Sequence, residues 1–225
     1  MNTYLDGEGG VFMEKSYTKF FTTGASVLLK IRPGHFATNH AHINYYIDVT
    51  TLKARTKEAE EVAQALVGMY LYDTVIDTIV CMEGTEVIGA FLAEELAKGG
   101  FLSTNAHKSI YVISPEFNNN SQIIFRDNLI PMIRDKHVMI LMASVTTGRT
   151  LNKAVESIQY YGGILQGASA IFSAMDSLDG VPIKSVFGKK DLPDYTYSDY
   201  RDCPLCKAGK KIDALVNTFG YSPMG

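Results

Sequence analysis

Five consecutive residues, Thr146-Thr147-Gly148-Arg149-Thr150, carry groups that suit the binding of a phosphate. They stand between an apolar run that predicts a buried strand and an amphipathic segment that predicts a helix. The free N–H groups and the positive dipole end of such a helix favour an anion. Glycine lets the backbone approach the ligand, while the hydroxyls and the guanidinium add donors and charge. A plain helix cap needs only one such side chain, so the pattern favours a phosphate site.

The three cysteines and five histidines are candidate metal ligands. An odd number of cysteines argues against a disulfide framework. Cys203 and Cys206 have the spacing of half a zinc knuckle or of a redox pair, but no second C-x-x-C or histidine close in the sequence completes a tetrahedral site. We interpret them as reduced and structural, with a metal site (shared across a dimer) and a redox pair as alternatives. His40 and His42 alternate as on a strand, without an accompanying acid, which favours pocket or surface roles over metal binding.

The spacing of apolar residues predicts that strands and helices alternate from about residue 56 to residue 186. This order favours a mainly parallel sheet covered by helices on both faces. The predicted strands cover residues 77–82, 108–114, 137–142, 164–173 and 182–187. The predicted helices cover residues 57–71, 84–98, 128–134 and the segment from the Thr/Gly loop to residue 161.

The two ends of the chain do not follow this alternation. We expect an N-terminal hood, residues 1–55, with a helix near residues 14–29 and a strand near residues 43–49. The α/β core covers residues 56–188. A C-terminal extension, residues 189–225, is expected to contain a short helix, whose apolar face carries Ile212, Leu215, Val216 and Phe219.

Composition excludes several classes of function. The 225 residues carry a net charge of -3, so nothing in the charge balance indicates a nucleic-acid partner. The mean hydropathy is +0.01, and no apolar run reaches the ~18 residues of a membrane span. The N-terminus lacks a basic-then-apolar secretion signal, so the expected location is the cytoplasm.

The strand and loop around residue 146 resemble the signature of the type I phosphoribosyltransferases. That signature has four apolar residues, two acids, two variable residues and a Thr/Gly-rich phosphate loop. Residues 138–141 match the apolar positions, and residues 144–150 match the variable pair and the loop. Met142 and Ala143 stand where the family has its two acids.

Three further stretches are similar to the orotate phosphoribosyltransferases. GHFATNHAHINYYIDV, residues 34–49, resembles a segment of the base pocket and dimer contact, which implies base-pocket roles for Phe36 and His42. DTIVCMEGTEVIGAFLAEEL, residues 77–96, resembles the pyrophosphate-loop strand and its helix. CPLCKAG, residues 203–209, resembles a tail of some members. The pyrophosphate loop implied by this resemblance is Met82, Glu83, Gly84 and Thr85.

The resemblance implies the type I phosphoribosyltransferase fold, an α/β fold with a central, mainly parallel five-stranded sheet, helices on both faces and an N-terminal hood. The implied activity transfers ribose 5-phosphate from phosphoribosyl pyrophosphate to a nitrogenous base, with Mg²⁺, in pyrimidine biosynthesis or in salvage. The implied assembly is a homodimer. The alternative is a non-catalytic sensor that binds a nucleoside monophosphate or phosphoribosyl pyrophosphate and acts on a protein partner.

Two differences between this sequence and the family pattern bear on the choice between an enzyme and a sensor. The family's acid pair binds the ribose hydroxyls, which Met142 and Ala143 cannot do. A glutamate in a first helical turn ordinarily complements the helix dipole, but Glu83 or Glu86 could replace the pair by holding Mg²⁺ or a ribose hydroxyl. In addition, residues 114–122, which match the family's mobile loop, contain no Lys or Arg. This loop is either a surface turn or a lid with neutral asparagine donors.

Overall fold

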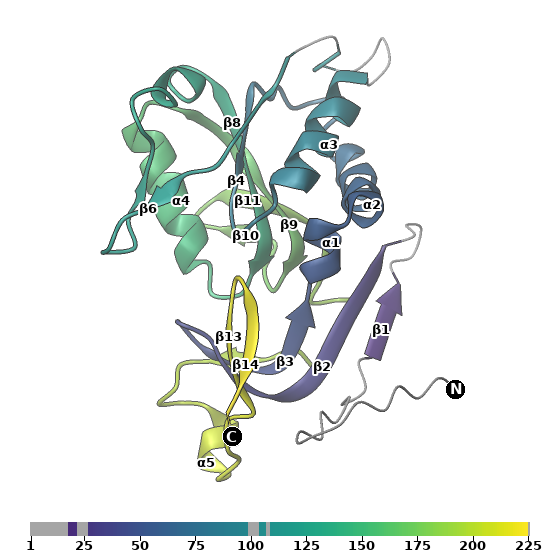
Figure 1. Ribbon diagram of the computed structural model, residues 1–225, viewed down its shortest axis with the longest axis vertical. Helices are drawn as coiled ribbons and strands as arrows, with labels where there is room; N and C mark the ends of the chain where they lie inside the picture. Colours follow the sequence, from purple (N-terminus) through teal and green to yellow (C-terminus); the bar gives the residue numbers. More distant parts are fainter. Residues whose placement is uncertain (1–17, 22–26, 99–103, 107–108, 225) are drawn as a thin grey trace, which may run out of the picture.

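The structure is a computed structural model that describes residues 18–21, 27–98, 104–106 and 109–224 (Figure 1). Its core is a sheet of five parallel strands in the order β11-β9-β8-β4-β5, extended at one edge by the two-residue antiparallel strand β10. The strands are β4 (Thr78–Cys81), β5 (Tyr111–Ile113), β8 (His137–Val145), β9 (Ile164–Ser173), β10 (Ser177–Leu178) and β11 (Val181–Gly188). The parallel sheet predicted from the alternating pattern is confirmed.

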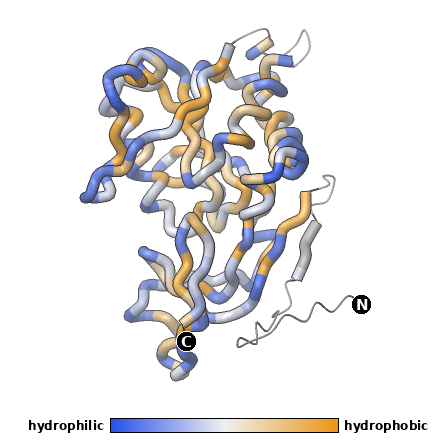
Figure 2. Tube along the Cα trace, in the orientation of Figure 1, coloured by the Kyte–Doolittle hydropathy of each residue, from blue (hydrophilic) through white to orange (hydrophobic). Residues whose placement is uncertain are grey.

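Helices cover both faces of this sheet because successive strand residues point to opposite sides. On one side, α2 (Thr56–Val67) and α3 (Glu86–Lys98) pack against a cluster that includes Ile79 and Leu141. On the other side, α4 (Arg149–Tyr160) packs against a cluster that includes Ile140. Figure 2 shows hydrophobic segments running through the core where the strands and helices pack together.

A second sheet lies beside the carboxyl end of the core strands and joins both ends of the described chain (Figure 1). Its order is β12-β3-β2-β13-β14, and β1 also pairs with β2. The short helix α1 (Thr50–Ala54) leads from this sheet into the core. Thus the hood and the C-terminal extension form one sheet rather than two separate additions. Its strands are β1 (Thr18–Phe21), β2 (Leu28–Ala37), β3 (His42–Asp48), β12 (Tyr197–Ser198), β13 (Ala214–Asn217) and β14 (Gly220–Pro223).

The helix expected near residues 14–29 is wrong where the structure describes this segment. Residues 18–21 form β1, which pairs antiparallel with the start of β2. Val27, Leu29 and Ile31 are buried, while the residues between them are partly exposed. This period of two is the pattern of a strand. Residues 14–17 and 22–26 lie outside the described residues.

The helix expected around Ile212 to Phe219 is also wrong. The segment forms the hairpin of β13 and β14, and the backbone N–H of Phe219 donates to the side chain of Asn217 in the turn. Leu215 is 50% exposed and Phe219 is 94% exposed, so the apolar spacing does not mark a buried helical face. Pairing of β13 with β2 supplies hydrogen bonds that outweigh the local pattern.

Three smaller elements refine the remaining predictions. The segment 114–122 contains β6 (Glu116–Phe117) and the turn that joins it to β7 (Ile123–Ile124) in a hairpin, rather than a plain loop. The helix expected at residues 128–134 is the short 3-10 helix η1 (Ile130–Met132). The helix α5 (Pro204–Lys207) contains part of the C-x-x-C motif. Within the described ranges, no helix combines the length and the apolar character needed to span a bilayer.

Candidate active site at the end of the central strand

A cavity of about 220 Å³ lies where the carboxyl end of β8 meets the second sheet. Open α/β sheets bind ligands outside the carboxyl ends of their strands. The walls come from the β2–β3 loop, α1, the β4–α3 turn, the β8–α4 loop and the β13–β14 turn. The cavity is therefore built by both sheets.

All five residues of the predicted phosphate loop line this cavity. Gly148 stands immediately before α4 with φ 74°, a left-handed conformation that glycine adopts without a Cβ penalty. A Cβ at this position would lie 2.8 Å from a side-chain carbon of Leu178. The hydroxyl of Thr146 lies 3.0 Å from that of Tyr195. The loop thus presents its hydroxyls, Arg149 and the N-terminus of a twelve-residue helix to one cavity.

Glu83 brings a carboxylate to the place where the family signature has its acids. Its Oε2 accepts hydrogen bonds from the backbone N–H of Ala143 at 3.2 Å and of Ser144 at 3.3 Å. Met142 and Ala143 also line the cavity, so the end of β8 opens into it. Glu83 has φ 60°, a left-handed conformation that costs energy for a residue with a Cβ.

Burial changes the pKa values of Glu83 and of the neighbouring Lys53. Burial raises the pKa of Glu83, although the Ser144 amide and the Lys53 ammonium partly offset this shift. Burial lowers the pKa of Lys53, which lies on α1. The Lys53 Nζ donates to the carbonyl of Glu83 at 2.7 Å and to that of Thr218 at 3.1 Å. Lys53 therefore joins the β4–α3 turn to the β13–β14 turn across the cavity.

The other members of the expected pyrophosphate loop do not line the cavity. Met82 is buried against the core, and the Thr85 hydroxyl donates to the carbonyls of Met82 at 2.9 Å and Leu141 at 3.0 Å. Gly84 is exposed with φ 80°. Glu86 begins α3 and accepts a hydrogen bond from Ser114 at 2.7 Å. Of the two glutamates weighed as replacements for the acid pair, the geometry brings only Glu83 to the cavity.

The two residues expected in the base pocket, Phe36 and His42, are not among the residues that line this cavity. Phe36 is 1% exposed and its ring packs on Tyr46, while the ring of His42 contacts that of His35. His40, in the loop between them, lines the cavity instead. Burial lowers the pKa of His40, and the nearby Arg149 and Lys153 lower it further.

The hairpin that matches the mobile loop adds no cation to the cavity. Arg126, at its base, donates two hydrogen bonds of 2.7 Å to Glu116 within the same hairpin. Lys108, on the other side of the hairpin in sequence, lies outside the described residues.

Several features of the site have no strong local signal in the sequence. Lys53, Tyr195 and the β13–β14 turn reach the cavity only through the pairing of the two sheets. Sequence reasoning also missed the convergence of His35 and His42 with Cys203 and Cys206. The spacing of the two histidines, H-x6-H, together with C-x-x-C was the available signal.

The comparisons with known proteins concern structure. No protein-family model and no curated protein matches the sequence. A phosphoribosyltransferase from Corynebacterium diphtheriae superposes with a TM-score of 0.51 at 15% identity, over 72% of this chain and 90% of that one. UMP synthase from Leishmania donovani gives a TM-score of 0.52 at 18% identity, over 72% of this chain but 34% of that longer one. Orotate phosphoribosyltransferase from Mycobacterium tuberculosis gives a TM-score of 0.49 at 15% identity, over 73% of this chain and 92% of that one.

The fold follows from the likeness to the Corynebacterium diphtheriae and Leishmania donovani proteins together with the parallel sheet and its flanking helices. The chain has the type I phosphoribosyltransferase fold.

Proposed function

We propose that this protein transfers ribose 5-phosphate from phosphoribosyl pyrophosphate to a nitrogenous base of the pyrimidine type, as a homodimer. The observation that carries the proposal is that the Glu83 carboxylate and the phosphate loop line one cavity. Such a cavity can bind a phosphate group through the loop and the hydroxyls of a sugar through the carboxylate. The fold and the similar structures support the same reaction class without naming the base.

In this proposal the residues promote the reaction by positioning the substrates and by stabilising charge in the transition state. Residues 146–150 hold the 5-phosphate, and Glu83 accepts hydrogen bonds from the ribose hydroxyls in place of the missing acid pair. A base nitrogen forms the new bond to C1 of the ribose, and the C1–O bond to diphosphate breaks with its electron pair. A proton carried by the attacking nitrogen leaves to solvent or to a nearby base. His40, whose lowered pKa favours its neutral form, faces this reaction from the hood loop.

The residues present are compatible with Mg²⁺ bound mainly by the substrate. Glu83 is the one carboxylate among the described residues that line the cavity. Among those residues its Oε1 takes part in no hydrogen bond, so it can supply one ligand. Magnesium is commonly held by one or two carboxylates together with substrate phosphates. When bound, the ion would neutralise charge on the leaving diphosphate.

A second candidate function is a sensor that binds the same ligands without turnover. Two observations favour it: Met142 and Ala143 stand in place of the acids, and the guanidinium of Arg126 is bonded to Glu116 within the hairpin rather than placed at the cavity. A site with an intact phosphate loop but few diphosphate contacts should bind a nucleoside monophosphate at least as tightly as phosphoribosyl pyrophosphate.

The test combines calorimetry with an assay of diphosphate release. We expect base-dependent release of diphosphate with one member of a panel of pyrimidine and purine bases. Thr147→Val should weaken binding of a nucleoside monophosphate by at least about 10-fold, since it removes a hydroxyl donor from the phosphate. Thr196→Val, at an exposed threonine outside the cavity, is the matched control and should leave binding unchanged.

The two functions give different results. Binding that depends on Thr147, with no diphosphate release on any base, contradicts the enzyme and supports the sensor. Equal binding by wild type and Thr147→Val would remove the phosphate loop from both proposals.

A further inference from the structure

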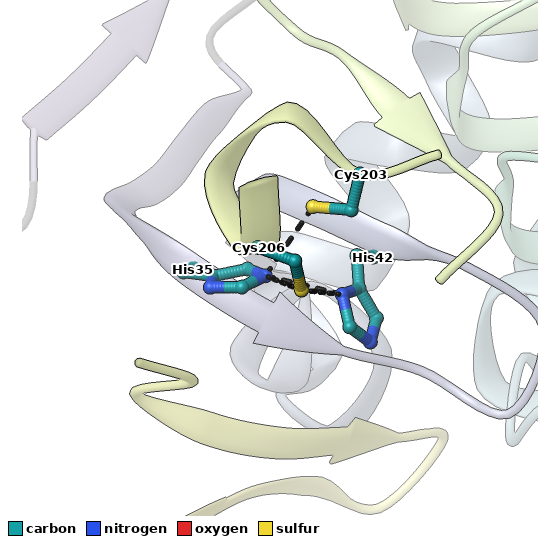
Figure 3. Close-up of side chains that lie close together, drawn as sticks. All are labelled: His35, His42, Cys203 and Cys206. Atoms are coloured by element: carbon teal, nitrogen blue, oxygen red, sulfur yellow. Dashed lines mark hydrogen bonds between the residues drawn. The ribbon is translucent and has the colours of Figure 1, made fainter. Parts of the chain in front are cut away.

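Four potential metal ligands from distant parts of the chain converge where strands β2 and β3 of the second sheet meet the segment of α5 (Figure 3). His35 lies on β2, His42 begins β3, and Cys203 and Cys206 belong to the segment of α5. Their ligand atoms all lie within 4.8 Å of one another. Both cysteines are free thiols in the structure. From this convergence we infer that the protein binds one structural zinc ion through His35, His42, Cys203 and Cys206.

The distances between the ligand atoms match a tetrahedral zinc site. Bonds of about 2.3 Å to sulfur and about 2.0–2.1 Å to nitrogen place sulfur and nitrogen about 3.5 Å apart, and two nitrogens about 3.4 Å apart. The Nε2 of His35 lies 3.5 Å from the sulfur of Cys203 and 3.7 Å from that of Cys206. The Nδ1 of His42 lies 3.3 Å from the Cys206 sulfur and 3.1 Å from His35 Nε2.

The surroundings of His35 prepare its Nε2 for a metal. Its Nδ1 lies 2.8 Å from the carbonyl of Lys210, and a carbonyl only accepts, so Nδ1 carries the proton. In the neutral ring this leaves a lone pair on Nε2, which faces the other three ligand atoms. Zinc-bound histidines commonly donate their second N–H to a carbonyl in this way. His35 is fully buried, so the ring is held in this orientation.

The backbone at the two cysteines forms a short helical turn. Cys203 precedes α5, and its carbonyl accepts the backbone N–H of Lys207 at 3.0 Å. The N–H of Gly209 donates to the carbonyl of Cys206 at 2.9 Å, and Gly209 has φ 73°. The chain therefore turns tightly around the two sulfurs. Binding would release the two thiol protons and leave a neutral centre of one Zn²⁺ and two thiolates.

Four protein ligands close the coordination shell, which is the arrangement of structural rather than catalytic zinc. The site also joins segments that are far apart in the sequence, since His35 and Cys203 are separated by 168 positions. The proposed zinc site also lies next to two segments that line the cavity described above. The loop between His35 and His42 lines the cavity, and Asp213, bonded to the backbone of His35 at 2.7 Å, leads into the β13–β14 hairpin.

Metal analysis of the protein, purified without a metal-affinity step, tests the inference. We expect about one zinc per chain by mass spectrometry. Cobalt exchanged into the site should give the strong visible bands of a tetrahedral ion and a sulfur-to-cobalt charge-transfer band. Competition with a chromophoric chelator should show at least about 100-fold weaker zinc binding in Cys206→Ser and in His42→Gln.

Matched controls separate a specific site from general disruption. His40→Gln removes a histidine from the same hairpin, and Cys81→Ser removes the third cysteine, so both should keep one zinc per chain. Cys206 is exposed, so its serine variant leaves the hydrophobic cores intact. Chelation of zinc from the wild type should lower its Tm without any substitution.

Two results would overturn the inference. One is an absence of zinc in the purified protein together with no uptake after reduction and reconstitution. The other is an octahedral cobalt spectrum without sulfur ligation. A disulfide between Cys203 and Cys206 in fresh protein that takes up no zinc after reduction would identify a redox pair instead.

Discussion

At the scale of single residues, Glu83 combines features that seldom serve stability. It has a strained backbone, a partly buried carboxylate and a position beside the end of β8. Burial of an ionised carboxylate is unfavourable, which is the reason that its pKa is raised. A residue that costs stability is expected to contribute to ligand binding or to catalysis.

The variant Glu83→Gln tests whether Glu83 lowers stability and supports catalysis. The pKa of Glu83 is raised above its ordinary value of 4.5, so the folded protein holds this proton more tightly than the unfolded chain. The free energy of unfolding therefore falls as the pH rises from about 4.5 through the raised pKa. Glutamine does not ionise and keeps an oxygen for the amides of Ala143 and Ser144. We expect the variant to melt higher than wild type above this pH window, to converge with it below, and to lose turnover by about 10²-fold.

The measurement is Tm against pH together with the diphosphate assay. Glu86→Gln is the matched control, because Glu86 is exposed and outside the cavity. It should change neither the pH slope nor turnover. A Glu83→Gln variant that keeps full turnover would refute the role of Glu83 as a substitute for the acid pair.

Among the secondary-structure elements, the β8–α4 loop forms part of the cavity from residues that are consecutive in the sequence. The strand ends at Val145, the helix begins at Arg149, and Gly148 makes the turn between them. The left-handed conformation of Gly148 disfavours any residue with a Cβ, and a Cβ here would require the side chain of Leu178 to shift. The geometry of the phosphate loop therefore depends on this one glycine.

Gly148→Ala should weaken both the fold and ligand binding. An alanine in the left-handed region costs about 1–2 kcal/mol, and its Cβ would also displace Leu178. Gly180→Ala is the matched control, because Gly180 has φ 83° but nothing within 4 Å of its Cβ position. Both variants should melt at lower temperature, but only Gly148→Ala should weaken binding of a nucleoside monophosphate in calorimetry. Equal losses of affinity would show that backbone strain alone, and not the shape of the loop, sets binding.

At the scale of the whole molecule, the cavity exists because two sheets meet. The parallel sheet supplies Glu83 and the phosphate loop, and the second sheet supplies the hood loop and the β13–β14 turn. Lys53 joins the two through the carbonyls of Glu83 and Thr218. Order at the β13–β14 turn should therefore depend on a residue more than 160 positions away.

Lys53→Met should loosen this connection while keeping most of the apolar stem. We expect faster hydrogen exchange in residues 214–223 and a Tm lower by about 2–5 °C, because two charge-assisted hydrogen bonds are lost. Lys57→Met, at an exposed lysine of α2, is the control and should change neither. Unchanged exchange in the hairpin would show that pairing of β13 with β2 alone holds it in place.

Features that depend on neighbours along the chain could be predicted from the amino-acid sequence. The α/β alternation and the parallel strands follow from local periodicity, and the chemistry of TTGRT predicts that the loop at the start of α4 binds phosphate. Hydrophobic spacing and helix-terminal geometry act within a few residues, so they can be read from one segment.

Features that depend on pairing between distant segments could not be predicted in this way. The described parts of the expected terminal helices are strands of one sheet, Glu83 rather than Glu86 lines the cavity, and His42 lies in a cluster with His35, Cys203 and Cys206. The reason is physical. A strand completes its backbone hydrogen bonds only with a partner strand, and a metal-ligand set exists only where separate segments meet, so neither is fixed by the residues next to it in sequence.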